Sequence, residues 1–477
     1  MITTYNVRIW KTEVYKGQRV TTYYVRWSVD GNEFKESYRN KAQAESFRSD
    51  LVSAARKGEA FYVVTGLPVS MARANERLSW YEFACNYTDL KWPHVAATTR
   101  RTHAEALTMI TMLLVVTERG RPDDKVLRMA LKRWAFNTPR RDDPSRPEQV
   151  RAALQWIASH TKQVSALSDP DVLRGVLNGL TICLDGTQRS PTVVTRWRKI
   201  LNNAFEFAVD QKLLAINPLP ALRRQSARVV QVHAVDRRVV ANPVQIRTLL
   251  QAVREQEPSG PRLVAFYGCL YFAGMRPEEA AALALPDLAL PATGWGELHL
   301  TRAKPYAGKE WTNTGEARDD RQLKQREINE VRPVPCPPEL TALLHAHLDR
   351  FGTGPTGRLF VGERNREHLP TLTVTRVWAR ARVAVFTEGV AASPLARTPY
   401  DLRHAAVSTW LNAGIPPTKV AEWAGHSIEV LLKIYAKCLD GEDAKLRSQV
   451  QSALGRDPTD KNDPQHPQGR QKITGSG

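Results

Sequence analysis

Proline and glycine divide residues 398–435 into short segments that a chain has few ways to fold. Pro399 suits the first turn of a helix, where its missing N–H costs nothing, and Gly414 suits the position just past a helix end. Pro416-Pro417 then opens a second segment, and Gly425 closes it. The spacing predicts three consecutive helices, the last of which begins directly after this glycine.

The three predicted helices carry three side chains that suit the same chemistry: Arg403, His426 and Tyr435. A guanidinium binds phosphate, an imidazole moves a proton, and a phenol can attack phosphorus. Each residue alone is more often structural, because an arginine pairs with a carboxylate, a histidine caps a helix and a tyrosine packs in a core. Their order and spacing in one basic chain favour phosphodiester chemistry through a tyrosine nucleophile.

The net charge supports a polyanionic partner. The chain has 477 residues, which suits about two to four domains, and its 68 Lys and Arg against 49 Asp and Glu give a net charge of +19. The sequence pI of about 9.8 makes nucleic acid the leading partner, although charge alone also fits an anionic membrane surface or a basic protein with no acidic partner.

Metal and membrane functions are not indicated. The five cysteines are scattered without zinc-ligand spacing, so we expect no metal and a reducing compartment. No stretch approaches the roughly 20 apolar residues that span a bilayer, and the N-terminus lacks the apolar run of a signal peptide. We therefore expect a cytoplasmic protein that associates with the nucleoid when it binds DNA.

Residues 1–66 differ in composition from the rest of the chain. Three segments rich in Val, Tyr, Trp and Thr precede a helical pattern that starts after Asn40, which predicts a three-stranded sheet followed by a helix. Lys11, Arg19 and Arg26 are interleaved with aromatic residues there. Such a face suits a DNA groove, but a solvated sheet with basic edges explains it equally well.

The rest of the chain reads as mainly helical. Residues 74–225 are all-helical, and one amphipathic helix near their end carries the basic residues Arg196, Arg198 and Lys199 as further candidate DNA contacts. Residues 226–241 form a linker, residues 242–455 combine helices with short strands, and residues 456–477 are too polar to fold. The predicted fold class is α+β, mainly α with small β elements.

A metal-free phosphodiester site needs a second arginine, because the phosphate gains negative charge in the transition state. Arg276 in YFAGMRPEEAAAL fits this need. It follows an apolar helix that stops at Gly274, and Pro277 starts a new helix directly after it. An arginine at such a junction is held by two rigid elements.

The four motifs together resemble the tyrosine recombinases, specifically the phage-type and mobile-element integrases. They read GMRPEEAAALALPDL, TPYDLRHAAVSTWLNAGI, VAEWAGHS and LLKIYAKCLDG. The resemblance implies an arm-type DNA-binding domain at 1–66, a helical core-binding (SAM-like) domain at 74–225, and a mixed α/β catalytic domain at 242–455.

The resemblance also implies residue roles. Arg276 and Arg403 would clamp the scissile phosphate, and Tyr435 would attack it to give a 3′-phosphotyrosyl bond and a free 5′ hydroxyl. His426 would hydrogen-bond the phosphate or assist proton transfer. Glu279 would be a supporting acid that orients Arg276.

The family places a lysine on a β-hairpin between the two arginines, where it acts as a general acid. Lys324 matches best, because the RPVPCPPEL run after it resembles the return strand of such a hairpin. Lys304 and Lys309 are alternatives, since the polar excursion between the predicted strands is long.

One position departs from the family pattern. The family usually has a histidine three residues before the second arginine, where this chain has Tyr400. A phenol with an unperturbed pKa near ~10 is a poor general base at neutral pH. His404 follows the arginine, but a residue one position along lies about 100° around a helix, so we expect it to point elsewhere.

The resemblance implies a site-specific recombinase that integrates or excises a mobile element. Two alternatives remain: a type IB topoisomerase-like enzyme with the same chemistry, and an inactive DNA-binding module. The implied partners are double-stranded DNA attachment sites, a homotetramer on two duplexes, and an excision or directionality factor. We expect no cofactor and no ATP, because the phosphotyrosyl bond conserves energy and the sequence lacks a P-loop.

Overall fold

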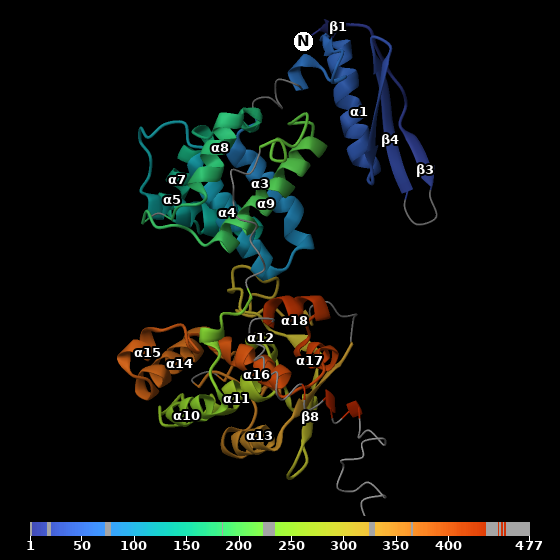
Figure 1. Ribbon diagram of the computed structural model, residues 1–477. Coiled ribbons are helices and arrows are strands. Elements are labelled where there is room, and N and C mark those ends of the chain that lie inside the picture. Colours follow the sequence, from blue (N-terminus) through green and yellow to red (C-terminus); the bar gives the residue numbers. More distant parts are fainter. Residues whose placement is uncertain are drawn as a thin grey trace, which may run out of the picture. The chain divides into compact units, whose positions relative to one another are not determined.

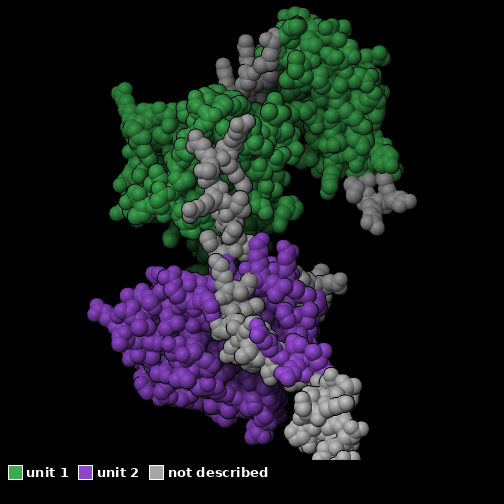
Figure 2. All heavy atoms as spheres, viewed as in Figure 1, with its two compact units in different colours: residues 1–230, 305–319 green, residues 231–304, 320–477 purple. Residues whose placement is uncertain are grey.

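The protein is described as a computed structural model. It describes residues 2–16, 21–71, 78–183, 185–222, 234–323, 330–363 and 366–435, together with positions 447, 450, 451, 453 and 454. The chain divides into two compact units (Figure 2). Unit 1 contains residues 1–230 and 305–319, and unit 2 contains residues 231–304 and 320–477.

The first part of unit 1 is a small antiparallel sheet with one helix. Its elements are β1 (Thr3–Thr4), β2 (Val7–Ile9), β3 (Glu13–Lys16), β4 (Thr21–Val29), β5 (Asn32–Tyr38), α1 (Lys41–Arg56) and β6 (Phe61–Tyr62). The central strand β4 pairs with β5 along one edge and with both β2 and β3 along the other. The expected three strands are present as β2, β4 and β5 and are followed by the expected helix, and β3 is an additional strand.

Alternation along β4 explains why α1 packs on one face of this sheet. Val25, Trp27 and Val29 are buried at every second position, as a half-buried strand requires. Ala44 and Leu51 of α1 are buried in the same cluster. The helix begins at Asn40, whose side chain accepts a hydrogen bond from the backbone N–H of Ala42.

The second part of unit 1 is helical (Figure 1). Its elements are α3 (Trp80–Lys91), η1 (Trp92–His94), α4 (Ala97–Leu113), α5 (Asp124–Ala130), η2 (Leu131–Ala135), α6 (Thr138–Arg141), α7 (Glu148–Ser159), η3 (Val164–Ser168), α8 (Pro170–Gly179) and α9 (Pro191–Asp210). The apolar stripe expected on α9 is buried, including Trp197, Leu201 and Phe205. A capping box between Ser79 and Glu82 starts α3.

Residues 305–319 leave unit 2 and pack in unit 1. Trp311 is only 1% exposed and belongs to the hydrophobic core of the helices. The buried guanidinium of Arg100 donates to the carbonyl oxygen of Trp311 (2.9 Å) and to Oδ1 of Asn313 (2.7 Å). The polar segment between the predicted strands is thus part of a core. It contributes the large side chain of Trp311, and the backbone carbonyl of this residue is hydrogen-bonded by a buried arginine.

In unit 2 the helix α11 (Val264–Phe272) is almost completely buried by the other elements of the unit. Its other helices are η4 (Arg237–Val239), α10 (Pro243–Arg254), α12 (Pro277–Ala280), η5 (Leu285–Asp287), α13 (Pro338–Phe351), α14 (Thr371–Val385), α15 (Glu388–Ala392), α16 (Asp401–Asn412), α17 (Pro417–Ala424) and α18 (Ile428–Tyr435). The last three are the helices predicted from the proline and glycine spacing. Gly425 has a φ of 64° and ends α17 in the left-handed region, as expected.

The strands of unit 2 are short. They are β7 (Leu288–Ala289), β8 (Gly296–Leu300), β9 (Arg302–Ala303), β10 (Arg321–Gln322) and β11 (Arg332–Cys336). Three form an antiparallel sheet in the order β11-β8-β7, and β9 pairs with β10 as a separate two-stranded ribbon. The architecture is therefore a mixture of helices with small sheets, which agrees with the predicted fold class.

We predict that Trp311→Ala destabilises unit 1 by about 3–5 kcal/mol, because it removes a buried indole from a packed core. In scanning calorimetry of the full chain, the unfolding transition of unit 1 should occur at a lower temperature in the variant than in wild type. The matched control is Trp295→Ala in unit 2, where the side chain is 67% exposed and its loss should cost little. Equal melting profiles for Trp311→Ala and wild type would show that residues 305–319 do not contribute to the core.

Candidate active site

Arg276 is fixed by the turn that follows it. Pro277 starts α12 directly after the arginine, which brings Glu279 back over the helix start. The backbone N–H of Arg276 donates to Oε2 of Glu279 (2.8 Å), and Nη1 donates to Oε1 (2.7 Å). The sequence Arg-Pro-Glu-Glu therefore folds Arg276 onto the buried carboxylate of Glu279.

A third arginine, Arg332, joins this carboxylate and was not among the residues predicted from the sequence. Its Nη1 and Nη2 donate to Oε1 (3.0 Å) and Oε2 (2.7 Å) of Glu279, and both side chains are almost fully buried. The strand β11 buries Arg332 in phase with Val334 and Cys336. A charged residue on the buried side of a strand requires a buried partner, and that signal was available in the sequence.

Arg403 lies in α16 and is 0% exposed. Its Nη1 donates to the carbonyl oxygen of Gly274, and its Nη2 donates to the carbonyl oxygen of Ala424 (2.5 Å). Burial and the neighbouring charge of Arg276 both lower the pKa of the guanidinium. The arginine is therefore held by helix-end carbonyls from two other segments.

Two glycines make this close approach feasible. Gly274 and Gly425 both adopt positive φ, of 56° and 64°, where a side chain is strained. The carbonyl oxygen of Gly425 accepts a hydrogen bond from Nη2 of Arg276 (2.7 Å). A Cβ atom at Gly425 would collide with the guanidinium of Arg332, so only glycine fits between the arginines.

His426 follows Gly425 and contacts the second arginine. Nη2 of Arg403 lies 2.8 Å from Nε2 of His426. Because a guanidinium only donates, Nε2 must accept, and the proton of the neutral ring is then on Nδ1. Burial and the positive charges of Arg403 and Arg276 lower the pKa of His426 to about 3. The ring is thus neutral at pH 7, and its buried Nδ1 has no hydrogen-bond partner among the described residues.

Tyr435 ends α18 and is 1% exposed. Its hydroxyl oxygen lies 2.9 Å from Nδ1 of His404. The expectation that His404 points away from the site is therefore wrong. Helix α16 is buried around most of its circumference, so neighbouring residues about 100° apart both face functional side chains.

The side chains of Arg276, Arg332, Arg403 and Glu279 form a largely buried charge cluster, in which positive charges outnumber negative ones. Glu279 is the carboxylate that contacts Arg276 and Arg332, and Arg403 lies beside them without an acidic hydrogen-bond partner among the described residues. Burial raises the pKa of Glu279, but Arg332 and Arg276 outweigh this effect and hold it at about 2. Such an excess of buried guanidinium groups suits a bound anion.

The remaining candidates for catalytic or supporting roles are less defined. Lys324 lies outside the described residues. The backbone N–H of Lys304 donates to the carbonyl oxygen of Glu278 in α12 (2.8 Å), and its ammonium pairs with Asp320 (3.2 Å), whereas Lys309 belongs to unit 1. Tyr400 is 36% exposed, and its ring meets that of His404 edge-on at 5.1 Å.

The candidate DNA contacts lie in unit 1. Arg19 is outside the described residues, and Lys11 is exposed. Arg26 forms ion pairs with Glu13 and Glu33, which leaves less of its charge available for a phosphate. On α9, Arg196 and Lys199 are exposed and Arg198 is partly buried.

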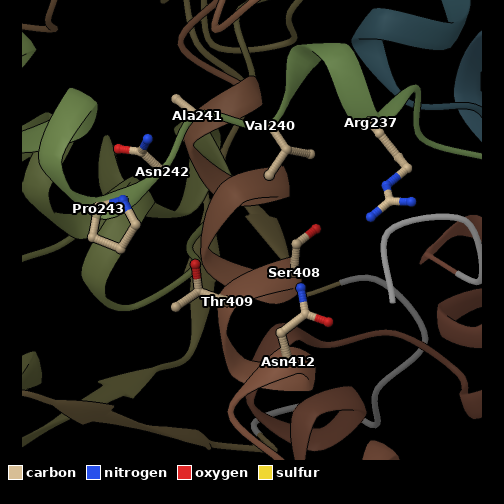
Figure 3. A pocket seen from close by; sticks show the side chains of 8 residues that line it. All are labelled: Arg237, Val240, Ala241, Asn242, Pro243, Ser408, Thr409 and Asn412. Atoms are coloured by element: carbon tan, nitrogen blue, oxygen red, sulfur yellow. The ribbon is translucent and has the colours of Figure 1, made fainter. Parts of the chain in front are cut away.

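A cavity of about 400 Å³ on unit 2 does not include the arginine cluster (Figure 3). Its lining comes from Arg237, from residues 240–243 and from Ser408, Thr409 and Asn412 of α16. Within the described part of the chain, no group of three or more His, Cys, Asp or Glu side chains is placed to hold a metal ion. None of the described helices combines the length and apolar character needed to cross a bilayer.

Comparison with known proteins finds one family model that matches part of the chain. Residues 240–442 match the model of the phage integrase family. This segment contains Arg276, Arg403, His426 and Tyr435. Residues 240–442 are therefore similar to the phage integrase family, as the motifs in the sequence led us to expect.

Several solved structures resemble the chain weakly. The Tn1549 transposon integrase in complex with transposon right end DNA is 16% identical, with a TM-score of 0.47 over 69% of this chain and 99% of that one. XerH site-specific recombinase bound to its difH substrate is 13% identical, with a TM-score of 0.45 over 80% and 97%. A lambda integrase tetramer bound to a Holliday junction is 15% identical, with a TM-score of 0.43 over 91% and 94%. No curated protein sequence matches the chain.

We predict that Glu279→Gln destabilises the protein at pH 7 by about 3–5 kcal/mol, because it leaves buried arginines uncompensated. The pKa of this carboxyl is below its ordinary value of 4.5 in the folded chain, so its stabilisation is complete above that pH and is lost as the pH falls towards about 2. Scanning calorimetry should therefore show the difference between wild type and variant shrinking over that range.

Glu339→Gln is the matched control for this variant. Glu339 pairs with Arg247 at the surface of the same unit (2.8 Å), and such an exposed pair is worth at most about 1 kcal/mol. Equal destabilisation by the two variants at pH 7 would contradict the assignment of Glu279 as the buried charge that holds the cluster.

Proposed function

We propose that the protein cuts and rejoins DNA through Tyr435, with the scissile phosphate bound among Arg276, Arg403 and His426. The observation that supports this most strongly is that two buried hydrogen-bond donors of the site lack acceptors within the part of the chain that the structure describes. Nε of Arg403 and Nδ1 of His426 are buried without a hydrogen-bond partner among the described residues. An unsatisfied buried donor costs about 1–3 kcal/mol, so a site that keeps two of them is prepared for a ligand with acceptor oxygens.

The geometry suits a phosphodiester better than a neutral ligand. We place the non-bridging oxygens beside the guanidiniums of Arg276 and Arg403, where the Nε–H of Arg403 and the Nδ1–H of His426, unpartnered among the described residues, are two available donors. These donors are fixed before the substrate arrives, so they stabilise the extra charge of the pentacoordinate transition state without reorganisation. Tyr435 supplies the nucleophile, and its hydroxyl is already held by a ring nitrogen.

The proposed reaction conserves bond energy. The Tyr435 oxygen forms a bond to phosphorus as the bond to the 5′ oxygen breaks, which gives a 3′-phosphotyrosyl intermediate and a free 5′ hydroxyl. Attack by a 5′ hydroxyl from another strand reverses the step and releases the tyrosine. The leaving 5′ oxygen needs a proton, and we assign this role to a hairpin lysine, Lys324 or alternatively Lys304.

The proposal extends to the assembly. DNA attachment sites would be bound by the basic surfaces of both units, with residues 1–66 as an arm-binding domain, 74–225 as a core-binding domain, 226–241 as a linker, 242–455 as the catalytic domain and 456–477 as a tail. Four copies would exchange strands between two duplexes, and a directionality factor would favour excision. No cofactor is needed for this chemistry.

A topoisomerase-like enzyme would use the same chemistry without a defined site. The match to the phage integrase family favours recombination. Relaxation of a supercoiled plasmid that lacks any attachment sequence separates the two functions, since a recombinase should leave it supercoiled.

We predict that Tyr435→Phe abolishes covalent complex formation with a nicked suicide duplex while its DNA affinity stays near that of wild type, because only the nucleophilic oxygen is removed. The duplexes would be taken from the DNA that flanks the coding sequence, where attachment sites commonly lie. Denaturing gel electrophoresis would report the adduct, and a mobility-shift titration the affinity. An adduct that persists in the phenylalanine variant would overturn Tyr435 as the nucleophile.

DNA binding should weaken steeply with salt, since each phosphate contact releases condensed counterions. Replacing Arg196 or Lys199 by alanine should reduce the slope of log K against log salt by about one for each phosphate that the original side chain neutralises. Arg174→Ala is the control, because this exposed arginine of unit 1 already pairs with Asp171 (2.6 Å). Slopes that are unchanged in all three variants would exclude α9 from the DNA interface.

A further inference from the structure

We propose that His404 is a catalytic residue that takes the proton from the Tyr435 hydroxyl as this oxygen attacks phosphorus. The inference rests on the proposed function and names the base that the sequence leaves without a candidate. At the position where the family usually has a histidine, this chain has Tyr400.

The contact between the two side chains is direct. Nδ1 of His404 lies 2.9 Å from the hydroxyl oxygen of Tyr435, and their ring centroids are 5.7 Å apart. The tyrosine is 1% exposed, so bulk water does not compete for its proton. His404 is carried by α16, the same buried helix that carries Arg403, so the base and the phosphate-binding arginine are positioned by one rigid element.

The two other side chains near the nucleophile are less suited to this role. Nε2 of His426 accepts from Arg403, and its Nδ1 carries the ring proton, so neither nitrogen is available as a base. The ring of Tyr400 contacts His404 rather than supplying a basic group, because a neutral phenol holds its proton at pH 7. Of these three residues, His404 is the one with a ring nitrogen on the reacting oxygen.

The charge state of His404 agrees with proton acceptance. Burial and the positive charge of Arg403 lower the pKa of His404 to about 4, so the imidazole is neutral before the reaction. With the ring proton on Nε2, Nδ1 accepts the hydrogen bond from Tyr435. A bound phosphate offsets the charge of Arg403 and makes the ring more basic, so DNA itself would prepare the base.

The step is balanced in atoms and electrons. The proton of Tyr435 moves to Nδ1 of His404, and the electron pair of the O–H bond forms the new bond between the tyrosine oxygen and phosphorus. The bond from phosphorus to the 5′ oxygen breaks, and that oxygen takes a proton from the hairpin lysine. In the rejoining step the imidazolium of His404 returns its proton to the departing tyrosine oxygen.

The test compares cleavage with joining in the full-length His404→Asn variant. Asparagine keeps an acceptor oxygen close to the Nδ1 position but does not take a proton at neutral pH. Cleavage is measured as covalent adduct on the suicide duplex. Joining is measured with a duplex whose 3′ end carries a 4-nitrophenyl phosphate, because the 5′ hydroxyl then displaces nitrophenolate, which leaves without a proton.

We expect His404→Asn to cleave about 100-fold or more slowly than wild type, as for loss of a general base. Joining to the nitrophenyl ester should stay near the wild-type rate, because the phosphate site is intact. The control is His347→Asn, which replaces a buried histidine of the same unit that hydrogen-bonds the carbonyl oxygen of Leu359 (3.0 Å) away from the arginines. Both reactions should be unchanged in this control.

Two results would overturn the inference. Unchanged cleavage in His404→Asn would show that the proton goes elsewhere, and an equal loss of cleavage and joining would show that His404 only supports the phosphate site. A wild-type protein that forms no adduct on any duplex that it binds would be a different result, because it would reject the proposed function itself.

Discussion

A single buried carboxylate holds the candidate site together. Glu279 accepts hydrogen bonds from the side chains of Arg276 and Arg332, and it also accepts from the backbone at the start of α12. Like charges so close together would repel one another in a buried environment, and the carboxylate makes their proximity stable. Because the guanidiniums still outnumber it, the cluster suits one more anion, which is the place that we propose for the scissile phosphate.

The helix ends around this carboxylate complete the arrangement. The carbonyl oxygens of Gly274 and Gly425 each accept from an arginine of another segment, so residues 129 and 149 positions apart in the chain fix one another. The same junction after α17 places His426 beside Arg403 and starts the helix that ends at Tyr435. The glycines and prolines that end and begin these helices thus also determine where the candidate site residues lie.

The sequence predicted the three helices of this candidate site because they lie in short, strongly marked segments. The helices that carry Arg403, His426 and Tyr435 are bounded by prolines and glycines whose backbone preferences leave few alternatives. Arg332 was missed because it lies in a strand far along the chain from Glu279, and only the alternation with Val334 indicated its burial. The contact of His404 with Tyr435 could not be predicted, since it depends on α16 being enclosed on several sides. The packing of Trp311 in unit 1 likewise depends on tertiary contacts that a polar local sequence conceals.

The proposed function requires this charge cluster to present a phosphate to Tyr435. The most direct measurement is mass spectrometry of the peptides released by protease from the covalent complex with a suicide duplex. We expect a nucleotide joined through its 3′ phosphate to the peptide that contains Tyr435, with fragmentation placing the modification on the tyrosine. A nucleotide attached to any other residue, or joined through a 5′ phosphate, would contradict it.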